Sequence, residues 1–253
     1  MAEAAASEPV FRVRGLTKSY GAKRVLDGLD FDVFPGECLV ILGRSGTGKS
    51  VTLRQLNGLE RPDAGSVVFG GADLCTLSER DLFPLRKRIG MLFQSGALFD
   101  SMNVADNVAF PLRAHTKLGR DEVAAKVHEV LEVVELPGIE DKMPAALSGG
   151  MRKRVALARS LVLQPEVLLF DEPTTGLDPM TADSIAHTIA TARDRAHTTT
   201  VVVTHDLHLA QTVASRLAFL EEGRFRFVGT WQEAQASDDV LLGHFLAGRR
   251  EDA

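Results

Sequence analysis

A glycine-rich stretch and a pair of neighbouring acids could together bind and hydrolyse a nucleotide. Residues 43–50 read GRSGTGKS and match the pattern G-x-x-x-x-G-K-[ST], after an apolar run and before a helix-favouring run. The backbone N–H groups of such a loop, with the N-terminus of the following helix, can surround phosphate oxygens. Lys49 would then reach the β- and γ-phosphates, and the Ser50 hydroxyl would be a ligand of Mg²⁺. The nucleotide-binding residues predicted here are Gly43, Arg44, Ser45, Gly46, Thr47, Gly48, Lys49, Ser50 and Val51.

The acids come at the end of a buried run, VLLFDEP at 167–173. A strand there would deliver Asp171 to the carboxyl edge of a sheet, where open α/β folds bind ligands. Asp171 is predicted to hold Mg²⁺, directly or through water, and Glu172 to polarise the attacking water. His205 follows another predicted strand at the same edge and could hydrogen-bond the terminal phosphate and that water. The alternatives are a glycine-rich turn and an acidic turn without a ligand.

A third stretch, LSGGMRKR at 147–154, places a hydroxyl and two glycines before a basic helix. Ser148 can cap that helix, while Gly149 and Gly150 expose its N–H groups to an anion. The alternative is a loop that only caps the helix. One nucleotide does not need two anion sites on one chain, but two chains packed head to tail would use both. Lys49 of one copy and Ser148 of the other would hold the same ATP, and hydrolysis would loosen the pair.

The elements that position these residues alternate between strands and helices, which predicts an α/β fold with a mainly parallel sheet covered on both faces. Strands are expected at 10–14, 29–34, 37–42, 66–69, 89–93, 167–170, 200–203 and 217–220, and helices at 49–57, 122–134, 151–163, 181–195 and 206–215. The region between about 73 and 165 is expected to be mostly helical. Thr230 and Glu233 fit a capping box, which predicts a further helix near the C-terminus.

Composition narrows the function. The chain has 253 residues, of which 45% are apolar, and a net charge of −5. That charge argues against broad binding to nucleic acid. No secretory signal is visible at the N-terminus, and no apolar run approaches the roughly 18 residues of a membrane span. Cys38 and Cys75 are expected to be reduced thiols of a cytosolic protein, and His208 a solvated helix residue.

In chain order these features resemble the nucleotide-binding subunit of ABC transporters. The features are Tyr20, the phosphate loop, Gln94, LSGG, Asp171 with Glu172, Asp178 and His205. The likeness runs from about Phe11 to Gly229. It implies a P-loop NTPase of ABC type, with antiparallel strands on the N-terminal side of the parallel core and an inserted helical subdomain. The implied single domain over 1–253 comprises a RecA-like and β core at about 10–94 and 165–230, a helical subdomain at about 95–164, and a C-terminal helical tail at 231–253.

The resemblance also implies roles for single residues. Tyr20, the only tyrosine, would stack on adenine. Gln94 would contact Mg²⁺ or water and sense the membrane partner, and Asp178 would lie at the seam between two copies. The expected catalytic residues are therefore Lys49, Gln94, Glu172 and His205. Most such signatures continue with Gln, where this chain has Met151, but the backbone cradle for ATP remains.

The segments FQSGALF at 93–99, NVAFPLR at 107–113 and LSGGM at 147–151 resemble the ATP-binding subunit of Mce/Mla-type phospholipid transporters of the bacterial envelope. This implies two copies of the chain on the cytoplasmic side of the inner membrane, beneath integral permease subunits and Mce-type periplasmic lipid-binding parts. An apolar groove for a short helix of the membrane subunit is also expected, although core packing is the alternative for each residue. Its expected lining residues are Leu98, Phe99, Val104, Phe110 and Leu112.

Three other functions remain as alternatives. A relative acting in DNA repair or translation usually has two cassettes, coiled-coil arms or zinc inserts, which this chain lacks. A nucleotide switch or kinase outside the ABC family would leave LSGG and Gln94 without roles. Within transport, the alternative is an importer of a small solute such as an amino acid.

Overall fold

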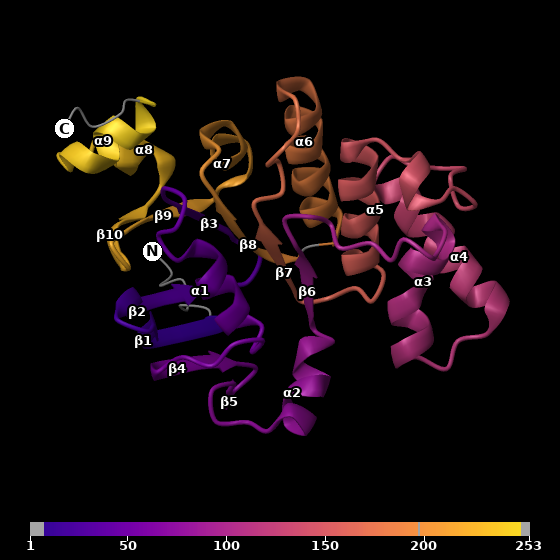
Figure 1. The fold of residues 1–253 in the computed structure, drawn as a ribbon, viewed down its shortest axis with the longest axis horizontal. Helices are drawn as coiled ribbons and strands as arrows, with labels where there is room; N and C mark the ends of the chain where they lie inside the picture. Colours follow the sequence, from indigo (N-terminus) through magenta and orange to yellow (C-terminus); the bar gives the residue numbers. More distant parts are fainter. Residues whose placement is uncertain (1–7, 197, 249–253) are drawn as a thin grey trace, which may run out of the picture.

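The computed structural model describes residues 8–196 and 198–248, and its strands form two sheets (Figure 1). The smaller sheet has the order β2-β1-β4-β5, and all its neighbouring strands are antiparallel. Its strands are β1 (Phe11–Tyr20), β2 (Lys23–Val33), β4 (Ala64–Phe69) and β5 (Ala72–Asp73). The expected antiparallel strands on the N-terminal side are therefore present.

The larger sheet has six strands in the order β10-β9-β3-β8-β7-β6. Its strands are β3 (Cys38–Leu42), β6 (Ile89–Leu92), β7 (Val167–Asp171), β8 (Thr199–Thr204), β9 (Arg216–Glu221) and β10 (Arg224–Gly229). All neighbouring pairs are parallel except the β9–β10 hairpin. The register pairs Leu42 with Thr204, and Asp171 with Val203. The segments that follow β3, β7 and β8 therefore leave the sheet at one edge.

Helices surround the larger sheet, and a group of three stands beyond β6 at the end remote from the small sheet (Figure 1). This group consists of α3 (Val104–His115), α4 (Arg120–Val133) and α5 (Gly149–Leu161), with a short 3₁₀ turn, η1 (Pro144–Ala146). The remaining helices are α1 (Lys49–Leu56), α2 (Glu79–Arg86), α6 (Pro179–Ala196), α7 (Leu207–Val213), α8 (Trp231–Gln235) and α9 (Val240–Leu246). The expected capping box is present, since Thr230 accepts a hydrogen bond from the N–H of Glu233.

The core has two parts because successive side chains of a strand point to opposite faces. Along β3, Leu39 and Ile41 pack with the small sheet, whereas Val40 and Leu42 pack with the helices that include α5 and α6. All five residues of β3 are buried. A strand buried on both faces explains the uninterrupted apolar run in the sequence.

The structure differs from the expected elements in the strands near each end of the chain. Strand β2 begins at Lys23, six residues before the expected start, because Gly28 at φ 74° interrupts its alternation without ending the strand. Strand β10 was not expected, although Phe225 and Phe227 alternate with arginines along it. Residues 249–253 of the expected tail, and residues 1–7 of the N-terminus, lie outside the described residues.

Two further expectations concern cysteines and membranes. Cys38 and Cys75 are both free thiols, as expected, and burial raises the pKa of Cys38 to about 12. Within residues 8–196 and 198–248, none of the helices has both the length and the apolar character that crossing a membrane requires.

Candidate functional site

The phosphate loop joins β3 to α1 and folds around the ammonium group of Lys49. The side chain of Lys49 is buried, and its Nζ donates to the carbonyl oxygens of Gly43 at 2.8 Å and Arg44 at 2.9 Å. Gly48 caps α1 at φ 108°, and a Cβ at this position would lie 2.6 Å from Leu26 Cδ2. The tight turn from strand to helix therefore requires glycine here.

Ser50 and Asp171 meet at the carboxyl edge of the large sheet. Ser50 Oγ donates to Asp171 Oδ1 at 2.6 Å, joining the start of α1 to the end of β7. Burial raises the pKa of Asp171, and the neighbouring charge of Glu172 raises it further, while the Ser50 hydrogen bond lowers it. A hydroxyl and a carboxylate oxygen are the hard donors that Mg²⁺ takes from a protein when phosphates and water supply its other ligands.

Glu172 is held by partners on both of its carboxylate oxygens. Oε1 lies 3.3 Å from Lys49 Nζ, and Oε2 lies 2.9 Å from His205 Nδ1. Burial alone raises the pKa of Glu172, but the His205 hydrogen bond and the Lys49 charge outweigh it, so the net pKa is lowered. The backbone of Glu172 has φ 47°, a strained value for a non-glycine residue that is typical of functional sites. The carboxylate is thus ionised and fixed in place.

Two hydroxyl groups that the sequence analysis did not single out also contact Glu172. Thr204 Oγ1 and Thr175 Oγ1 donate to Glu172 Oε2 at 3.2 Å and 3.3 Å. Thr204 directly precedes His205, and Thr175 lies three residues after the acid in a turn. Their positions beside recognised residues are the only signal in the sequence, and threonine at such positions is too common to stand out.

One hollow of 340 Å³ brings most of the predicted nucleotide and catalytic residues together. Its lining includes Tyr20, Ser45, Gly46, Gly48, Lys49, Ser50, Val51, Gln94, Glu172 and His205. Tyr20 is 44% exposed at its rim, and its hydroxyl donates to Glu60. The ring is therefore accessible to a stacked base while its hydroxyl is anchored.

The LSGG stretch lies at a different hollow. Ser148 caps α5 by accepting a hydrogen bond from Met151 N at 3.2 Å. A second hollow, of 360 Å³, is lined by Ser148, Gly150, Met151 and residues of α6, and it shares no lining residue with the first. Gly150 is needed for close packing, since a Cβ there would lie 2.5 Å from Thr181 Cγ2.

Asp178 belongs to neither hollow and has a local role in the structure. It caps α6 by accepting hydrogen bonds from the N–H and the hydroxyl of Thr181, at 3.0 Å and 2.6 Å. The Thr181 hydroxyl is the main reason why the pKa of Asp178 is lowered. Because Thr181 also abuts Gly150, the capped end of α6 and the first turn of α5 are packed together.

The predicted apolar groove exists, but part of its predicted lining was wrong. A groove of 660 Å³ contains Phe99 and Phe110, whose rings are 4.9 Å apart. Val104 and Leu112 are instead buried in the core, where α3 packs against its neighbouring helices, and Leu98 is partly buried against the same cluster. On α3, Val104, Val108 and Leu112 share the inward face, and Phe110 lies outside it.

Basic side chains line the same groove and were not predicted. They are Arg86, Lys87, His115 and Arg159. They come from three helices that are distant in sequence, so no local pattern could have grouped them. The described residues that line the groove include no aspartate or glutamate.

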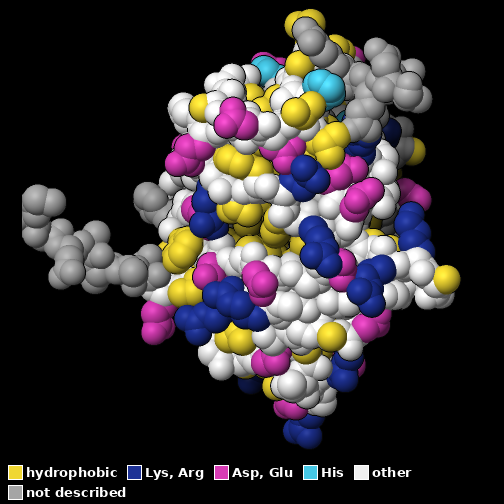
Figure 2. Space-filling view, turned by 90° about the vertical axis from the view of Figure 1, so that its left-hand side faces the viewer, with side chains coloured by type: hydrophobic (Ala, Val, Ile, Leu, Met, Phe, Trp, Pro, Cys, Tyr) yellow, Lys and Arg dark blue, Asp and Glu magenta, His cyan; other side chains and the backbone are white. Residues whose placement is uncertain are grey.

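Elsewhere, charges of both signs are interspersed. Figure 2 shows this for the face at the left of Figure 1, where β1, β2 and β10 lie. On these strands Asp27 pairs with Arg24 and Arg224, and Asp32 with Arg14. The described residues of these strands therefore form no extended basic patch of the kind that nucleic acid binding requires.

Comparison with known proteins gives a family and several transport relatives. A family model described as "ABC transporter" matches residues 26–175. The chain is 44% identical to the probable ribonucleotide transport ATP-binding protein mkl of Mycobacterium leprae, covering 94% of this chain and 69% of that protein. It is 38% identical to the intermembrane phospholipid transport system ATP-binding protein MlaF of Haemophilus influenzae, covering 97% and 93%. It is 40% identical to the methionine import ATP-binding protein MetN of Rhizobium johnstonii, covering 98% and 68%.

A solved structure shares the fold. The ATP-binding cassette MJ0796, described as a dimer in a post-hydrolysis state with ADP and phosphate bound, superposes with a TM-score of 0.80 at 29% identity. The match covers 87% of this chain and 98% of that one. The expected fold class, a mainly parallel α/β P-loop NTPase with an antiparallel sheet and an added group of helices, is confirmed.

Proposed function

The chain belongs to the ABC transporter family of ATP-binding proteins, and on that premise we propose that it powers phospholipid movement across a bacterial envelope. The observation that carries the ATPase part is the hollow that unites Lys49, Ser50, Glu172 and His205. A phosphate-binding loop and an ionised, fixed carboxylate lie there within reach of one nucleotide. We also propose that residues 1–253 form one ATP-binding cassette with the internal boundaries predicted from the sequence.

The residues of this chain divide the work of ATP hydrolysis. The backbone N–H groups of residues 43–51 and the Lys49 ammonium bind the phosphates, which the N-terminus of α1 further stabilises. Glu172 accepts a proton from the attacking water. His205, 2.9 Å from Glu172 Oε2, orients that carboxylate and hydrogen-bonds the terminal phosphate. Asp171 and Ser50, with Gln94, would hold Mg²⁺, which would neutralise charge on the phosphates.

Two copies complete each site. Ser148 opens onto a hollow that shares no lining residue with the phosphate hollow, which favours contact with the nucleotide of another copy over the one held by its own Lys49. A head-to-tail pair of copies places Ser148, Gly149 and Gly150 of one against the ATP of the other, with Asp178 at the seam. The dimeric form of the cassette MJ0796 supports this arrangement. Hydrolysis then removes the phosphate that joins the copies.

The partner in the membrane is expected at the groove that contains Phe99 and Phe110. Among the described lining residues, apolar walls with the cations Lys87 and Arg159, and no aspartate or glutamate, suit a short amphipathic helix that carries carboxylates. Arg86 in the same lining is already paired with Glu79. Phe93 lines this groove, and the next residue, Gln94, lines the nucleotide hollow. A helix seated in the groove is therefore linked to the reaction centre through one peptide unit. With such a partner, the chain is proposed to be a peripheral subunit on the cytoplasmic side of the inner membrane.

The cargo is inferred from relatives, since this chain does not itself contact what is moved. MlaF supports phospholipid because the match covers nearly the whole of both proteins. The names of mkl and MetN point to ribonucleotides and methionine, and the MetN likeness favours small-solute import as the second candidate. Mass spectrometry of the native complex isolated from membranes can distinguish phospholipid transport from small-solute import, because it identifies the companion proteins and the bound lipids. Recovery of Mce-type subunits with bound phospholipid is expected, whereas a solute-binding protein without lipid would refute the phospholipid assignment.

A further inference from the structure

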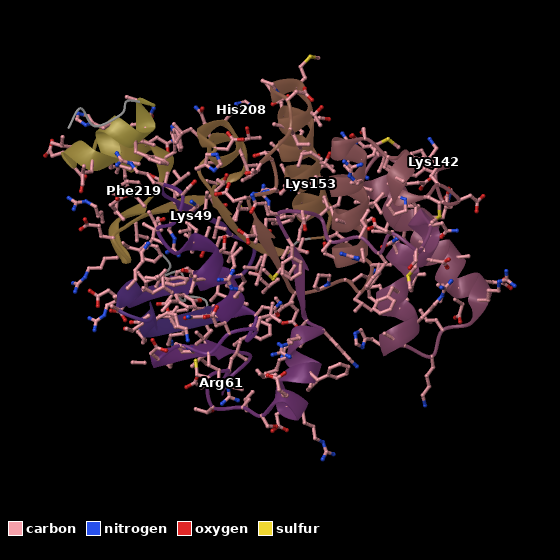
Figure 3. The ribbon with its side chains drawn as sticks, in the orientation of Figure 1. Lys49, Arg61, Lys142, Lys153, His208 and Phe219 are labelled. Carbon is pink, nitrogen blue, oxygen red and sulfur yellow. The ribbon has the colours of Figure 1, made fainter. Side chains whose placement is uncertain are left out.

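Lys153 is a buried lysine on α5 that the reaction outlined above does not use. Its side chain is 7% exposed, and Nζ donates a hydrogen bond to the backbone carbonyl oxygen of Gln94. Figure 3 shows it toward the middle of the molecule, whereas Lys142 lies at the outer edge of the helical group. Lysine is rarely buried, because removing its charge from water is unfavourable unless a partner compensates. Such a position therefore calls for a role.

Burial and the acids of the catalytic site act in opposite directions on the charge of Lys153. Burial lowers the pKa of Lys153, while the charges of Asp171 and Glu172 raise it. Lys153 belongs to α5, the helix that begins with LSGG.

The segment containing Gln94 lies along this same helix. Arg159 donates to the carbonyl oxygens of Gly96 at 3.0 Å and Ala97 at 2.9 Å. Gly96 and Ala97 both have positive φ, 76° and 46°. A Cβ on Gly96 would lie 3.5 Å from Ala156 Cβ of α5. Two cations of α5 therefore hold three carbonyl oxygens of a segment whose backbone is otherwise in an uncommon conformation.

A bond to the carbonyl oxygen of Gln94 fixes the peptide plane from which its side chain leaves. That side chain lines the hollow with Lys49, Ser50 and Glu172. Gln94 itself is exposed, so packing does not restrict it, and its position depends on its backbone. We propose that Lys153 is a positioning residue for ATP hydrolysis, which holds Gln94 at the nucleotide hollow. This rests on the proposed role of Gln94 at Mg²⁺ or the attacking water.

Replacing the lysine by a neutral side chain of similar length tests the proposal. In Lys153→Met we expect kcat of the full-length ATPase to fall about tenfold or more, because small misplacements of a reacting group are costly. The KM for ATP should change little, since the phosphate loop is untouched, and the Mg²⁺ concentration for half-maximal rate should rise. Lys153→Arg, which keeps a cationic donor, should retain most of the activity. Lys142→Met is the matched control and should behave like the parental protein.

A double-mutant cycle separates positioning from a general structural role. If Lys153 acts through Gln94, adding Lys153→Met to Gln94→Ala should lower kcat little beyond the effect of Gln94→Ala alone. If Lys153→Met lowered kcat by the same factor in the parental protein and in Gln94→Ala, the proposal would be overturned. A Lys153→Met variant with raised KM and unchanged kcat would overturn it as well. If Lys153→Met unfolds the protein, Lys153→Leu provides the same cycle. A parental protein without ATPase activity would instead refute the proposed function, so the two failures are distinguishable.

Discussion

The ammonium of Lys49 lies 3.3 Å from the carboxylate of Glu172, and the two side chains are 5% and 11% exposed. The cation assigned to the phosphates and the acid assigned to the water are therefore joined in one buried ion pair. A phosphate that binds Lys49 has to compete with Glu172 for it. Binding of the nucleotide and release of the carboxylate for catalysis are thus coupled through one bond.

Glu172→Gln should separate ATP binding from ATP hydrolysis. The amide cannot accept the proton of water, so the hydrolysis rate should fall about 10²–10⁴-fold. Binding should persist or strengthen, because Lys49 no longer has an anionic competitor. Steady-state ATPase assays with size-exclusion chromatography in ATP should show a slow enzyme that accumulates as a dimer. If this variant hydrolysed ATP at the parental rate, Glu172 would not be the general base.

Ser148→Arg should abolish hydrolysis while leaving ATP binding by a single chain nearly intact. The bulky cation blocks the second hollow, which shares no residue with the phosphate hollow. Ser148→Ala is the milder variant: it loses the α5 cap, worth about 1 kcal/mol, and the hydroxyl that we place on the other copy's ATP, but it does not block the hollow, so its ATPase activity should fall less. Fluorescent-nucleotide titration beside an ATPase assay checks both. If Ser148→Arg lost ATP binding and hydrolysis equally, Ser148 would belong to the site that binds ATP on its own chain, contrary to the proposal.

Gly150→Ala should destabilise the protein through a single methyl contact. The added Cβ would lie 2.5 Å from Thr181 Cγ2, and overpacking of this kind costs about 1–3 kcal/mol. Adding Thr181→Ser removes that methyl but keeps the hydroxyl bound to Asp178, so it should restore most of the free energy of unfolding. Urea denaturation measures both variants.

The control for this pair is Gly243→Ala on α9, where an added Cβ meets no heavy atom within 4 Å. It should be neutral, or stabilising by up to about 1 kcal/mol, because alanine favours helices. If Gly150→Ala lowered the free energy of unfolding no more than Gly243→Ala does, the close contact between residue 150 and Thr181 would be contradicted.

Phe110→Asp should uncouple the chain from its membrane partner. Phe110 is 42% exposed in the groove, and an acid there would repel the carboxylate-bearing helix that we propose. Co-purification with membrane proteins should drop, while the ATPase activity of the isolated chain stays near parental. Val240→Asp, at a 67% exposed valine on α9, is the control and should co-purify normally. Unchanged co-purification of Phe110→Asp would exclude this groove as the contact.

The ion pair of Arg88 with Glu166 should make stability depend weakly on pH. The hydrogen bond from Arg88 lowers the pKa of Glu166. The stabilisation from this ion pair is therefore fully present above the pKa of glutamate in the unfolded chain, about 4.3, and is lost as pH falls through the lower pKa of Glu166 in the folded protein. Both side chains are partly exposed, so the effect should be below about 1 kcal/mol. The difference in unfolding free energy between the parental protein and Glu166→Gln should shrink as pH falls below 4.3.

Local patterns predicted most of the large sheet and the residues of its carboxyl edge. Strand β7 is a buried apolar run that ends in Asp171 and is followed by Glu172, and such a run has few other interpretations. The phosphate loop was equally clear because its glycines and Lys49 have fixed spacing. The full length of β2 was missed because Gly28 interrupts a pattern that needs unbroken alternation.

Contacts between distant segments could not be predicted. Lys153 is one of three consecutive basic residues on α5, and the sequence does not show which of them contacts Gln94. Val104 and Phe110 are both apolar residues of α3, yet one is buried and the other lies in the groove. The packing of α3 against α4 and α5 decides between them, and the sequence of α3 alone is compatible with either.

The separation of the Lys49 and Ser148 hollows has a consequence for mixed populations. A pair related by two-fold symmetry forms both composite sites at once. A pair made of one Ser148→Arg copy and one intact copy would keep a single working site, because the defective copy still offers its own Lys49 to the intact Ser148. Each intact copy therefore completes one working site whichever copy it pairs with. In a cell that expresses both forms, activity would fall in proportion to the share of defective protein, and the defect would not be genetically dominant.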